Sequence, residues 1–242
     1  MNVMRIALIG YGKMGREIEE IARERGHEIV LIVDVNNQND LNAENMSRVD
    51  VAIEFTRPDA APDHVMSCFD FDVPVVCGTT GWTDQMPVVQ QRCLEENHSF
   101  LWASNFSLGV NIFFRINSFL ARIMNRFPDY EPDIEETHHT QKLDAPSGTA
   151  ISLAGGIINE LDRKNGWQLD RKDNDRKLKI SAIRRDKVPG THVVSYRSEV
   201  DDIQITHTAH SRRGFALGAV LAAEYLCGRR GVYTMDDLLN MD

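Results

Sequence analysis

The sequence predicts an α/β fold in two parts: an N-terminal Rossmann-type parallel sheet and a second, α+β domain. Over the first hundred residues, short apolar strands alternate with amphipathic helices, a pattern typical of a doubly wound parallel sheet. Beyond residue 105, strand candidates follow one another without helices between them, which indicates a second domain. A helix at 215–226 has an apolar face suited to packing back onto the first part. We therefore assign residues 1–104 and 212–242 to the first domain and residues 105–211 to the second.

The composition is that of an ordinary soluble globular protein, with 42% hydrophobic and 26% charged residues among 242. The formal net charge of −9 argues against nonspecific binding to nucleic acid or to an anionic membrane, because both need a basic surface. The four cysteines are too far apart for a C-x-x-C motif, and we expect reduced thiols. No apolar run approaches the roughly 18 residues of a membrane span and no secretory signal is evident, so we expect a cytoplasmic protein.

The first element is an apolar strand at residues 4–9, which ends in the loop Gly10-Tyr11-Gly12-Lys13-Met14-Gly15. An amphipathic helix follows and ends at Gly26, and a second strand at 28–33 ends in Asp34. Strand, G-x-G-x-x-G loop, helix, strand and acid together form the dinucleotide fingerprint, in which the glycines let the backbone approach a pyrophosphate at the helix N-terminus. The alternative is a glycine-rich turn that binds no ligand.

Asp34 bears on the choice of cofactor, because it follows Gly15 by 19 residues, the spacing of a ribose-binding acid. A carboxylate there suits the free 2′-hydroxyl of NAD and repels the 2′-phosphate of NADP. Val35 and the two asparagines after it offer no cation to offset that repulsion, although Arg16 could reach such a phosphate. We predict a preference for NADH, with use of NADPH left open.

Three further strands are predicted at 49–55, 73–77 and 100–103. Polar or glycine-rich loops follow them, notably Gly78-Thr79-Thr80-Gly81 and Ser104-Asn105-Phe106-Ser107. Because the carboxyl ends of parallel strands share one sheet edge, we expect these loops at the ligand-binding edge. A plain turn is the alternative for Gly78–Gly81.

The second part contains helices and strands placed by their periodicity. Helices are predicted at 111–127, 150–161 and 215–226, strands at 133–138, 178–184, 192–195 and 202–209, a charged loop at 162–177 and a turn at Pro189-Gly190. The three later strands are expected to form a β-meander.

The segment from His138 to Ala150 combines two imidazoles, an ammonium group and a Ser-Gly-Thr turn just before a helix. We predict that His138 and Lys142 supply a proton, while Ser147, the N-cap, with Gly148 and Thr149 captures a carboxylate at the helix N-terminus. The alternative is a solvated loop with surface histidines and a capped helix.

A metal site is the rival chemistry for the two histidines. Adjacent residues on a strand point to opposite faces, so His138 and His139 could not easily share one ion. The chain also lacks an H-E-x-x-H motif. We therefore predict no metal.

These residues resemble the signature of the bacterial dihydrodipicolinate reductases, also called 4-hydroxy-tetrahydrodipicolinate reductases, of lysine and diaminopimelate biosynthesis. The resemblance is carried by His138–Ala150, by Gly78–Gly81, by Ala103–Ser107 and by the segment Ser211–Ala219, and it covers essentially the whole chain. It implies a substrate-binding and tetramerisation domain of mixed sheet, a homotetramer, and hydride transfer from NADH or NADPH to C4 of a heterocyclic dicarboxylate.

The resemblance also implies roles for individual residues. His138 would be the proton donor/acceptor, Lys142 the proton donor, and His139, Gly148 and Thr149 would contact the dicarboxylate. Gly78, Thr79 and Thr80, with Ala103, Ser104, Asn105 and Phe106, would line the nicotinamide side.

The chain departs from the family pattern in two places: its glycine loop is one residue shorter than in many members, and Val35 stands where many carry a cation. Two other functions are weighed against this one. The first is another Rossmann dehydrogenase of a small dicarboxylate, such as an aspartate dehydrogenase. The second is an NAD(H)-sensing regulator without catalysis, against which the intact His138 and Lys142 argue.

Overall fold

The computed structural model describes residues 2–171 and 173–240. The chain divides into two compact units, of which the second is Gly109–Ser211 and the first consists of the segments before and after it. The first unit is therefore built from both ends of the chain. No helix in the described residues is long and apolar enough to cross a membrane.

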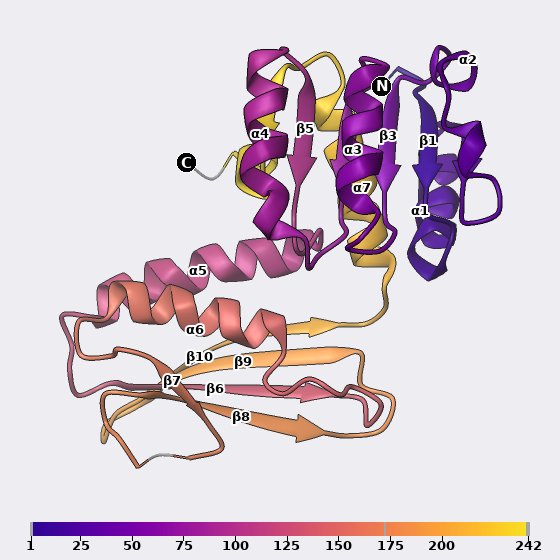
Figure 1. Ribbon diagram of the computed structural model, residues 1–242. Coiled ribbons are helices and arrows are strands. Elements are labelled where there is room, and N and C mark those ends of the chain that lie inside the picture. Colours follow the sequence, from indigo (N-terminus) through magenta and orange to yellow (C-terminus); the bar gives the residue numbers. More distant parts are fainter. Residues whose placement is uncertain (1, 172, 241–242) are drawn as a thin grey trace. The chain divides into compact units, whose positions relative to one another are not determined.

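The first unit contains a six-stranded parallel sheet in the order β11-β5-β4-β3-β1-β2 (Figure 1). Its strands are β1 (Arg5–Ile9), β2 (Glu28–Val33), β3 (Val51–Glu54), β4 (Val75–Cys77), β5 (Ser99–Trp102) and β11 (Gly231–Tyr233). The predicted Rossmann-type parallel sheet is confirmed. β11 was missed by the sequence analysis because three half-buried residues carry too little periodicity to identify a strand.

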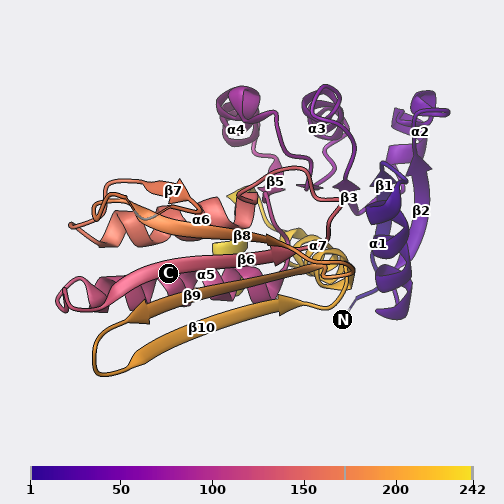
Figure 2. The same cartoon turned by 90° about the horizontal axis from the view of Figure 1, so that it is seen from below.

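Helices cover both faces of this sheet: α1 and α7 lie on one face, and α3 and α4 lie on the other (Figure 2). The helices of this unit are α1 (Lys13–Glu24), α2 (Ala43–Met46), α3 (Ala61–Asp70), α4 (Met86–Glu95), α7 (Arg213–Leu226) and α8 (Met235–Leu239). Alternation along β1 directs Ile6 and Leu8 toward α1 and α7, and Ala7 and Ile9 toward the opposite core. Fully buried strands of this kind are typical of parallel sheets.

Ion pairs join α1 and the turn that follows it to α7, although the two helices lie at opposite ends of the sequence. The Arg25 guanidinium donates to the Glu224 carboxylate at 2.7 and 2.9 Å, and His27 lies 2.8 Å from the same carboxylate. Arg213 pairs with two glutamates of α1. The segment after Ser211 is thus an integral part of the first unit.

The second unit contains a five-stranded mixed sheet in the order β10-β9-β6-β8-β7. Its strands are β6 (Glu131–His138), β7 (Trp167–Leu169), β8 (Leu178–Arg184), β9 (Gly190–Arg197) and β10 (Asp202–Ala209). The predicted meander is wrong: β6 lies between β8 and β9, parallel to β8 and antiparallel to β9. Gly190, predicted in a turn, begins β9, and the predicted loop at 162–177 contains β7, a three-residue strand at the sheet edge that pairs with β8.

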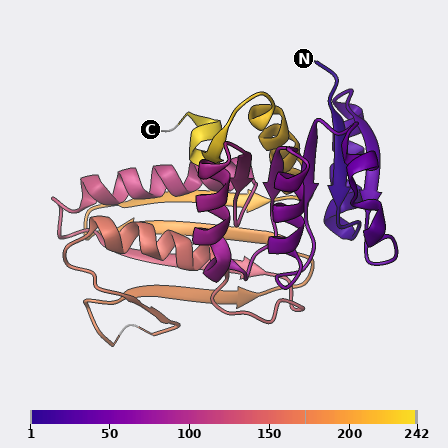
Figure 3. The same ribbon diagram turned by 45° about the horizontal axis from the view of Figure 1, so that its top comes forward.

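Two helices, α5 (Leu108–Met124) and α6 (Gly148–Glu160), lie side by side over one face of this sheet (Figures 1 and 3). Asn117 of α5 donates to the Leu153 carbonyl oxygen of α6 at 3.0 Å, and Arg122 pairs with Glu160. The core between helices and sheet includes Phe113, Leu153 and Ile134. The buried face of β6 therefore faces these helices.

Candidate functional site

The glycine loop of the first unit has the geometry that its motif predicts. Gly10 has φ = +96°, and a Cβ built there would lie 2.1 Å from the Phe55 carbonyl oxygen, so only glycine fits. A Cβ on Gly15 would lie 2.3 Å from the Gly10 carbonyl oxygen, which explains how the helix approaches the loop so closely. At Gly12 a Cβ would meet nothing within 4 Å. This open space beside the start of α1 fits a cofactor pyrophosphate.

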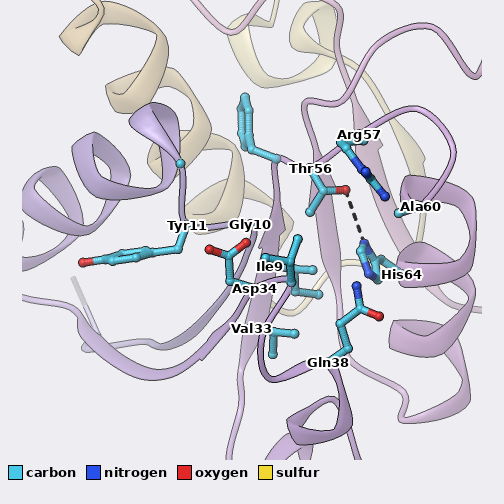
Figure 4. A pocket seen from close by; sticks show the side chains of 13 residues that line it. Ile9, Gly10, Tyr11, Val33, Asp34, Gln38, Thr56, Arg57, Ala60 and His64 are labelled. Carbon is cyan, nitrogen blue, oxygen red and sulfur yellow. Dashed lines mark hydrogen bonds between the residues drawn. The ribbon is translucent and has the colours of Figure 1, made fainter.

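A cavity of about 200 Å³ adjoins the loop and collects residues from the ends of β1, β2 and β3 (Figure 4). Asp34 projects its carboxylate into this space, and Thr56, Arg57 and His64 lie across from it. The full lining is Ile9, Gly10, Tyr11, Gly12, Val33, Asp34, Val35, Gln38, Phe55, Thr56, Arg57, Ala60 and His64. The position of the acid beside the glycine loop suits the ribose of a dinucleotide.

The guanidinium group of Arg16 is not part of this cavity lining. Its central carbon lies 5.2 Å from the centre of the Tyr11 ring, over the ring face. Lys13, Met14 and Gly15 form the first turn of α1. Among the described residues that line the cavity, Arg57 carries the guanidinium group, the side-chain type best suited to bind a phosphate. Its guanidinium is paired with the Asp59 carboxylate at 3.2 Å.

The loop Gly78-Thr79-Thr80 follows β4 and is fixed by a buried carboxylate, Glu54, at the end of β3. The Thr79 hydroxyl donates to Glu54 at 3.0 Å and accepts from the Thr56 amide at 2.8 Å. The Thr56 hydroxyl and the Cys77 thiol donate to the same carboxylate. Burial raises the pKa of Glu54, but these donors and His64 outweigh it and hold the pKa below its usual value.

The loop after β5 contains Ala103, Ser104, Asn105 and Phe106. Phe106 is buried, and its ring packs 5.7 Å from that of Phe55. Ala103 is also buried, whereas Ser104 is exposed and Asn105 half-buried. Of these four residues, Ser104 and Asn105 therefore have the more accessible side chains.

In the second unit, strand register brings a cluster of functional groups to one face of the sheet. Glu136 and His138 alternate along β6 with the exposed Glu135 and the half-buried Thr137, so both point to the buried face. His192 of β9 stands directly opposite Glu136, and Arg184 of β8 is paired with His138. The rings of His138 and His192 are 5.0 Å apart in an edge-to-face arrangement.

Glu136 is fully buried and is the hydrogen-bond centre of this cluster. Its two carboxylate oxygens accept from the Ser147 amide at 3.1 and 3.0 Å, and Arg184 donates to one of them at 3.3 Å. The Nδ1 atom of His138 lies 3.6 Å from the other oxygen, and Nε2 of His192 lies 3.7 Å from it. A buried carboxylate needs such donors to offset its lost hydration.

Lys142 and His139 lie in the loop that follows β6. The Lys142 ammonium donates to both oxygens of the exposed Asp144 carboxylate at 2.8 and 2.9 Å. Hydrogen bonding to Lys142 lowers the pKa of Asp144. His139 is half-buried and its carbonyl accepts from the Lys142 amide.

The turn at the start of α6 contains one residue with a structural role, Ser147, and two accessible residues, Gly148 and Thr149. Ser147 is buried; its hydroxyl accepts from the Ala150 amide at 3.2 Å and lies 3.2 Å from His192 Nε2. Its amide and hydroxyl are thus both engaged within the protein. Gly148 is exposed and Thr149 half-buried, and their amides belong to the first helical turn, which lacks intrahelical acceptors.

Both histidines of the cluster favour the neutral imidazole. Burial lowers the pKa of His138, with Lys142 and Arg184 adding to the effect and Glu136 opposing it. Burial, reinforced by the nearby His138, lowers the pKa of His192 to about 3. Neither Nδ1 atom has a hydrogen-bond partner among the described residues.

The structure assembles a set of metal-ligand types that the sequence analysis did not consider. Candidate ligand atoms of Glu136, His138 and His192 lie within 4.8 Å of one another. The carboxylate, however, already accepts from the Arg184 guanidinium and the Ser147 amide, so its charge is compensated. A cation here would stand beside that guanidinium, and these residues fit a metal poorly.

Several residues of these clusters were missed from the sequence. The sequence patterns singled out none of Glu54, Glu136, Arg184 and His192 as a site residue. Glu136 precedes His138 by two residues on a strand, and period-2 alternation could have placed them on one face. His192 and Arg184 depend on strand pairing with β6, which local sequence does not reveal.

Two family models match the chain. The model "Dihydrodipicolinate reductase, N-terminus" matches residues 4–106, and "Dihydrodipicolinate reductase, C-terminus" matches residues 109–239. Together they cover nearly the whole chain.

Curated relatives and a solved structure are also similar. A 4-hydroxy-tetrahydrodipicolinate reductase of Christiangramia forsetii is 52% identical over 98% of each chain, and one of Methanosarcina barkeri is 36% identical over 98% of this chain and 89% of its own. A dipicolinate-bound dihydrodipicolinate reductase from Paenisporosarcina sp. TG-14 has the same fold, with a TM-score of 0.81 and 23% identity over 96% of this chain and 98% of that one.

Proposed function

The chain belongs to the dihydrodipicolinate reductase family, as an NAD(P)H-dependent 4-hydroxy-tetrahydrodipicolinate reductase of lysine biosynthesis, and from this premise we propose how its residues divide the reaction. The product is tetrahydrodipicolinate, the substrate is a small heterocyclic dicarboxylate, and His138 and Lys142 form the proton-transfer site. The observation that carries this assignment is that the buried His138, Lys142 and the open start of α6 all lie within one short segment.

When bound, the nicotinamide would supply a hydride to C4 of the unsaturated ring, the dihydrodipicolinate that forms once the 4-hydroxyl group has left as water. Gly10 to Gly15 and Asp34 hold the dinucleotide by its pyrophosphate and ribose. Gly78, Thr79 and Thr80, with Ala103 to Phe106, line its nicotinamide end. Because Thr79 is fixed by Glu54, and Phe106 is packed into the core, these loops offer a rigid surface.

The residues of the second unit hold the dicarboxylate and deliver a proton to the carbon next to C4. The amides of Gly148 and Thr149 and the positive end of α6 attract one carboxylate, and His139 contacts the dicarboxylate as well. Ser147, although committed to the N-cap, sets the conformation of this turn. Lys142, held by Asp144, is the proton donor. His138, close to Lys142, is the proton donor/acceptor of the site.

The cofactor preference is proposed to be NADH. Asp34 faces the cavity where the ribose binds, Val35 beside it carries no charge, and Arg16 lies over Tyr11 rather than in the cavity lining. A 2′-phosphate would be placed beside the Asp34 carboxylate without a cation dedicated to it. Values of kcat/KM measured with both cofactors test this, and a tenfold preference for NADPH would overturn it.

We also propose a homotetramer located in the cytoplasm, where nicotinamide-dependent biosynthesis and the chain's unpaired thiols both belong. An apolar stripe supports self-association: Ile112, Ile116, Phe119 and Ile123 of α5 are all exposed, Phe119 by 64%. β10 is moreover an edge strand. Light scattering should give four times the 27.4 kDa chain mass, and Phe119→Glu should reduce it; a monomeric wild type would contradict the proposal.

The activity is tested by NADH oxidation with the freshly made product of dihydrodipicolinate synthase. We expect turnover whose kcat falls by about a hundredfold in Lys142→Ala and is also lowered in His138→Ala. An absence of turnover with this substrate, together with activity on another imino or keto acid, would show that the assignment is wrong.

A further inference from the structure

Glu136 and Arg184 form a buried ion pair, and apart from a bond from Arg184 to the Ile183 carbonyl oxygen their remaining hydrogen bonds reach the segment with the proposed catalytic groups. Glu136 is fully buried, Arg184 retains a fifth of its side-chain exposure, and their closest N···O distance is 3.3 Å. Neither residue belongs to the groups assigned above to proton transfer or to substrate contact. Each binds a different part of the loop between β6 and α6.

Glu136 fixes the far end of that loop. Both of its oxygens accept from the Ser147 amide, which sets the residue that caps α6 and precedes Gly148 and Thr149. The first two amides of the helix, which are the proposed anion contacts, therefore take their position from this carboxylate.

Arg184 fixes the near end of the loop. It donates to the Asp144 carbonyl oxygen at 2.7 Å and to the Lys142 carbonyl oxygen at 3.4 Å, and its own strand position is paired with His138. The planar guanidinium group directs its donors in a fixed fork, so one side chain holds two loop carbonyls and the carboxylate together.

We propose that Glu136 and Arg184 are positioning residues that act as one unit, fixing the Lys142 loop and the Ser147–Thr149 turn in the geometry that binds the substrate dianion. The pair contacts neither substrate nor cofactor in this scheme. It also neutralises the buried carboxylate, which would otherwise repel a dicarboxylate close by. This inference rests on the proposed function of the same site.

Because Glu136 is negatively charged, the direction in which anion affinity changes in Glu136→Gln distinguishes the two possible roles of this residue. If Glu136 were only a nearby negative charge, Glu136→Gln would reduce repulsion and tighten the binding of an anionic ligand several-fold. If Glu136 positions the turn, the same change weakens anion binding, because glutamine loses the second acceptor oxygen and the charge that strengthen the bonds to the Ser147 amide and the Arg184 guanidinium. The two roles therefore predict opposite changes in affinity.

The experiment measures dipicolinate binding by calorimetry, NADH binding, and kcat and KM for the full-length protein. For Glu136→Gln we expect dipicolinate affinity and kcat each to fall at least about tenfold, while the Kd for NADH stays within about twofold of wild type. The matched control is Glu135→Gln, which makes the same charge change at the neighbouring, exposed position of β6 and should alter neither ligand.

Arg184→Lys keeps the positive charge but loses the forked arrangement of donors. It serves as the second variant if Glu136→Gln folds poorly, and it should show the same loss of dipicolinate affinity with an intact thermal transition. The double variant should be no weaker than the weaker single variant, because two residues of one unit are not additive. Unchanged or tighter dipicolinate binding in Glu136→Gln, additive effects, or a wild type that binds no dipicolinate would overturn the proposal. Absence of wild-type turnover, in contrast, counts against the proposed function itself.

Discussion

The glycine loop allows a prediction in which two similar substitutions have different consequences. Alanine at Gly15 brings a Cβ within 2.3 Å of the Gly10 carbonyl oxygen, so the backbone must shift by about 1.1 Å to reach the 3.4 Å of ordinary contact. Such overpacking costs about 1–3 kcal/mol, and the higher helix propensity of alanine recovers about 1 kcal/mol. The net cost is about 0–2 kcal/mol, and at its midpoint of about 1 kcal/mol Gly15→Ala should lower Tm by about 2–4 °C. NADH binding should weaken at least about tenfold, because the loop itself moves.

Alanine at Gly12 meets no protein atom within 4 Å, and its φ of −79° suits any residue. The stability of Gly12→Ala should therefore stay within about 1 kcal/mol of wild type, the range of an N-cap change. Its Cβ nevertheless enters the space where a pyrophosphate approaches the backbone, so NADH affinity should fall at least about tenfold.

The assays are a thermal melt and a fluorescence titration with NADH, with dipicolinate binding as the control that both variants retain. Wild-type NADH affinity in Gly12→Ala would refute the close approach of the cofactor. Unchanged Tm and affinity in Gly15→Ala would refute the steric argument.

Three further predictions concern the second unit. Gly155→Ala should raise the free energy of unfolding by about 0.5–1 kcal/mol, because a Cβ there meets nothing within 4 Å. Gly156→Ala should not raise it, because a Cβ there lies 2.8 Å from the Ser118 hydroxyl. Urea denaturation of both variants measures the difference. The pKa of His192 is about 3 in the folded protein and near 6.5 when unfolded, so stability is complete above pH 6.5 and falls by about 1.4 kcal/mol per unit below it. His192→Gln should flatten this slope in denaturation curves at pH 7, 6 and 5. Lys142→Ala should lower kcat by about a hundredfold with unchanged NADH affinity, and equal losses of both would make Lys142 structural.

The parts of the fold that sequence predicts well are those whose signal is local. Short apolar strands that alternate with amphipathic helices, together with the spacing of the glycines to Asp34, identify the parallel sheet and its ligand edge. The N-cap role of Ser147 is equally local, since its hydroxyl accepts from an amide three residues on. These features need no knowledge of distant residues.

The remaining features depend on pairing between distant segments. The insertion of β6 between β8 and β9 depends on pairing with two strands that come much later in the chain, and the order of strands along the chain does not reveal it. His192 and Arg184 enter the site only through that register. β11 likewise depends on parallel pairing with β5, a segment far away in the sequence.

The construction of the first unit from both ends of the chain has a consequence for biosynthesis on the ribosome. β1 and β3 emerge early, yet the face formed by Ile6, Leu8 and Ile53 is covered partly by α7, whose residues are among the last to be translated. Until then the nascent nucleotide-binding sheet exposes that apolar face, whereas Gly109–Ser211 is already complete and able to fold first. Premature termination before Arg213 would therefore yield a chain with a folded second unit and an unfinished first one.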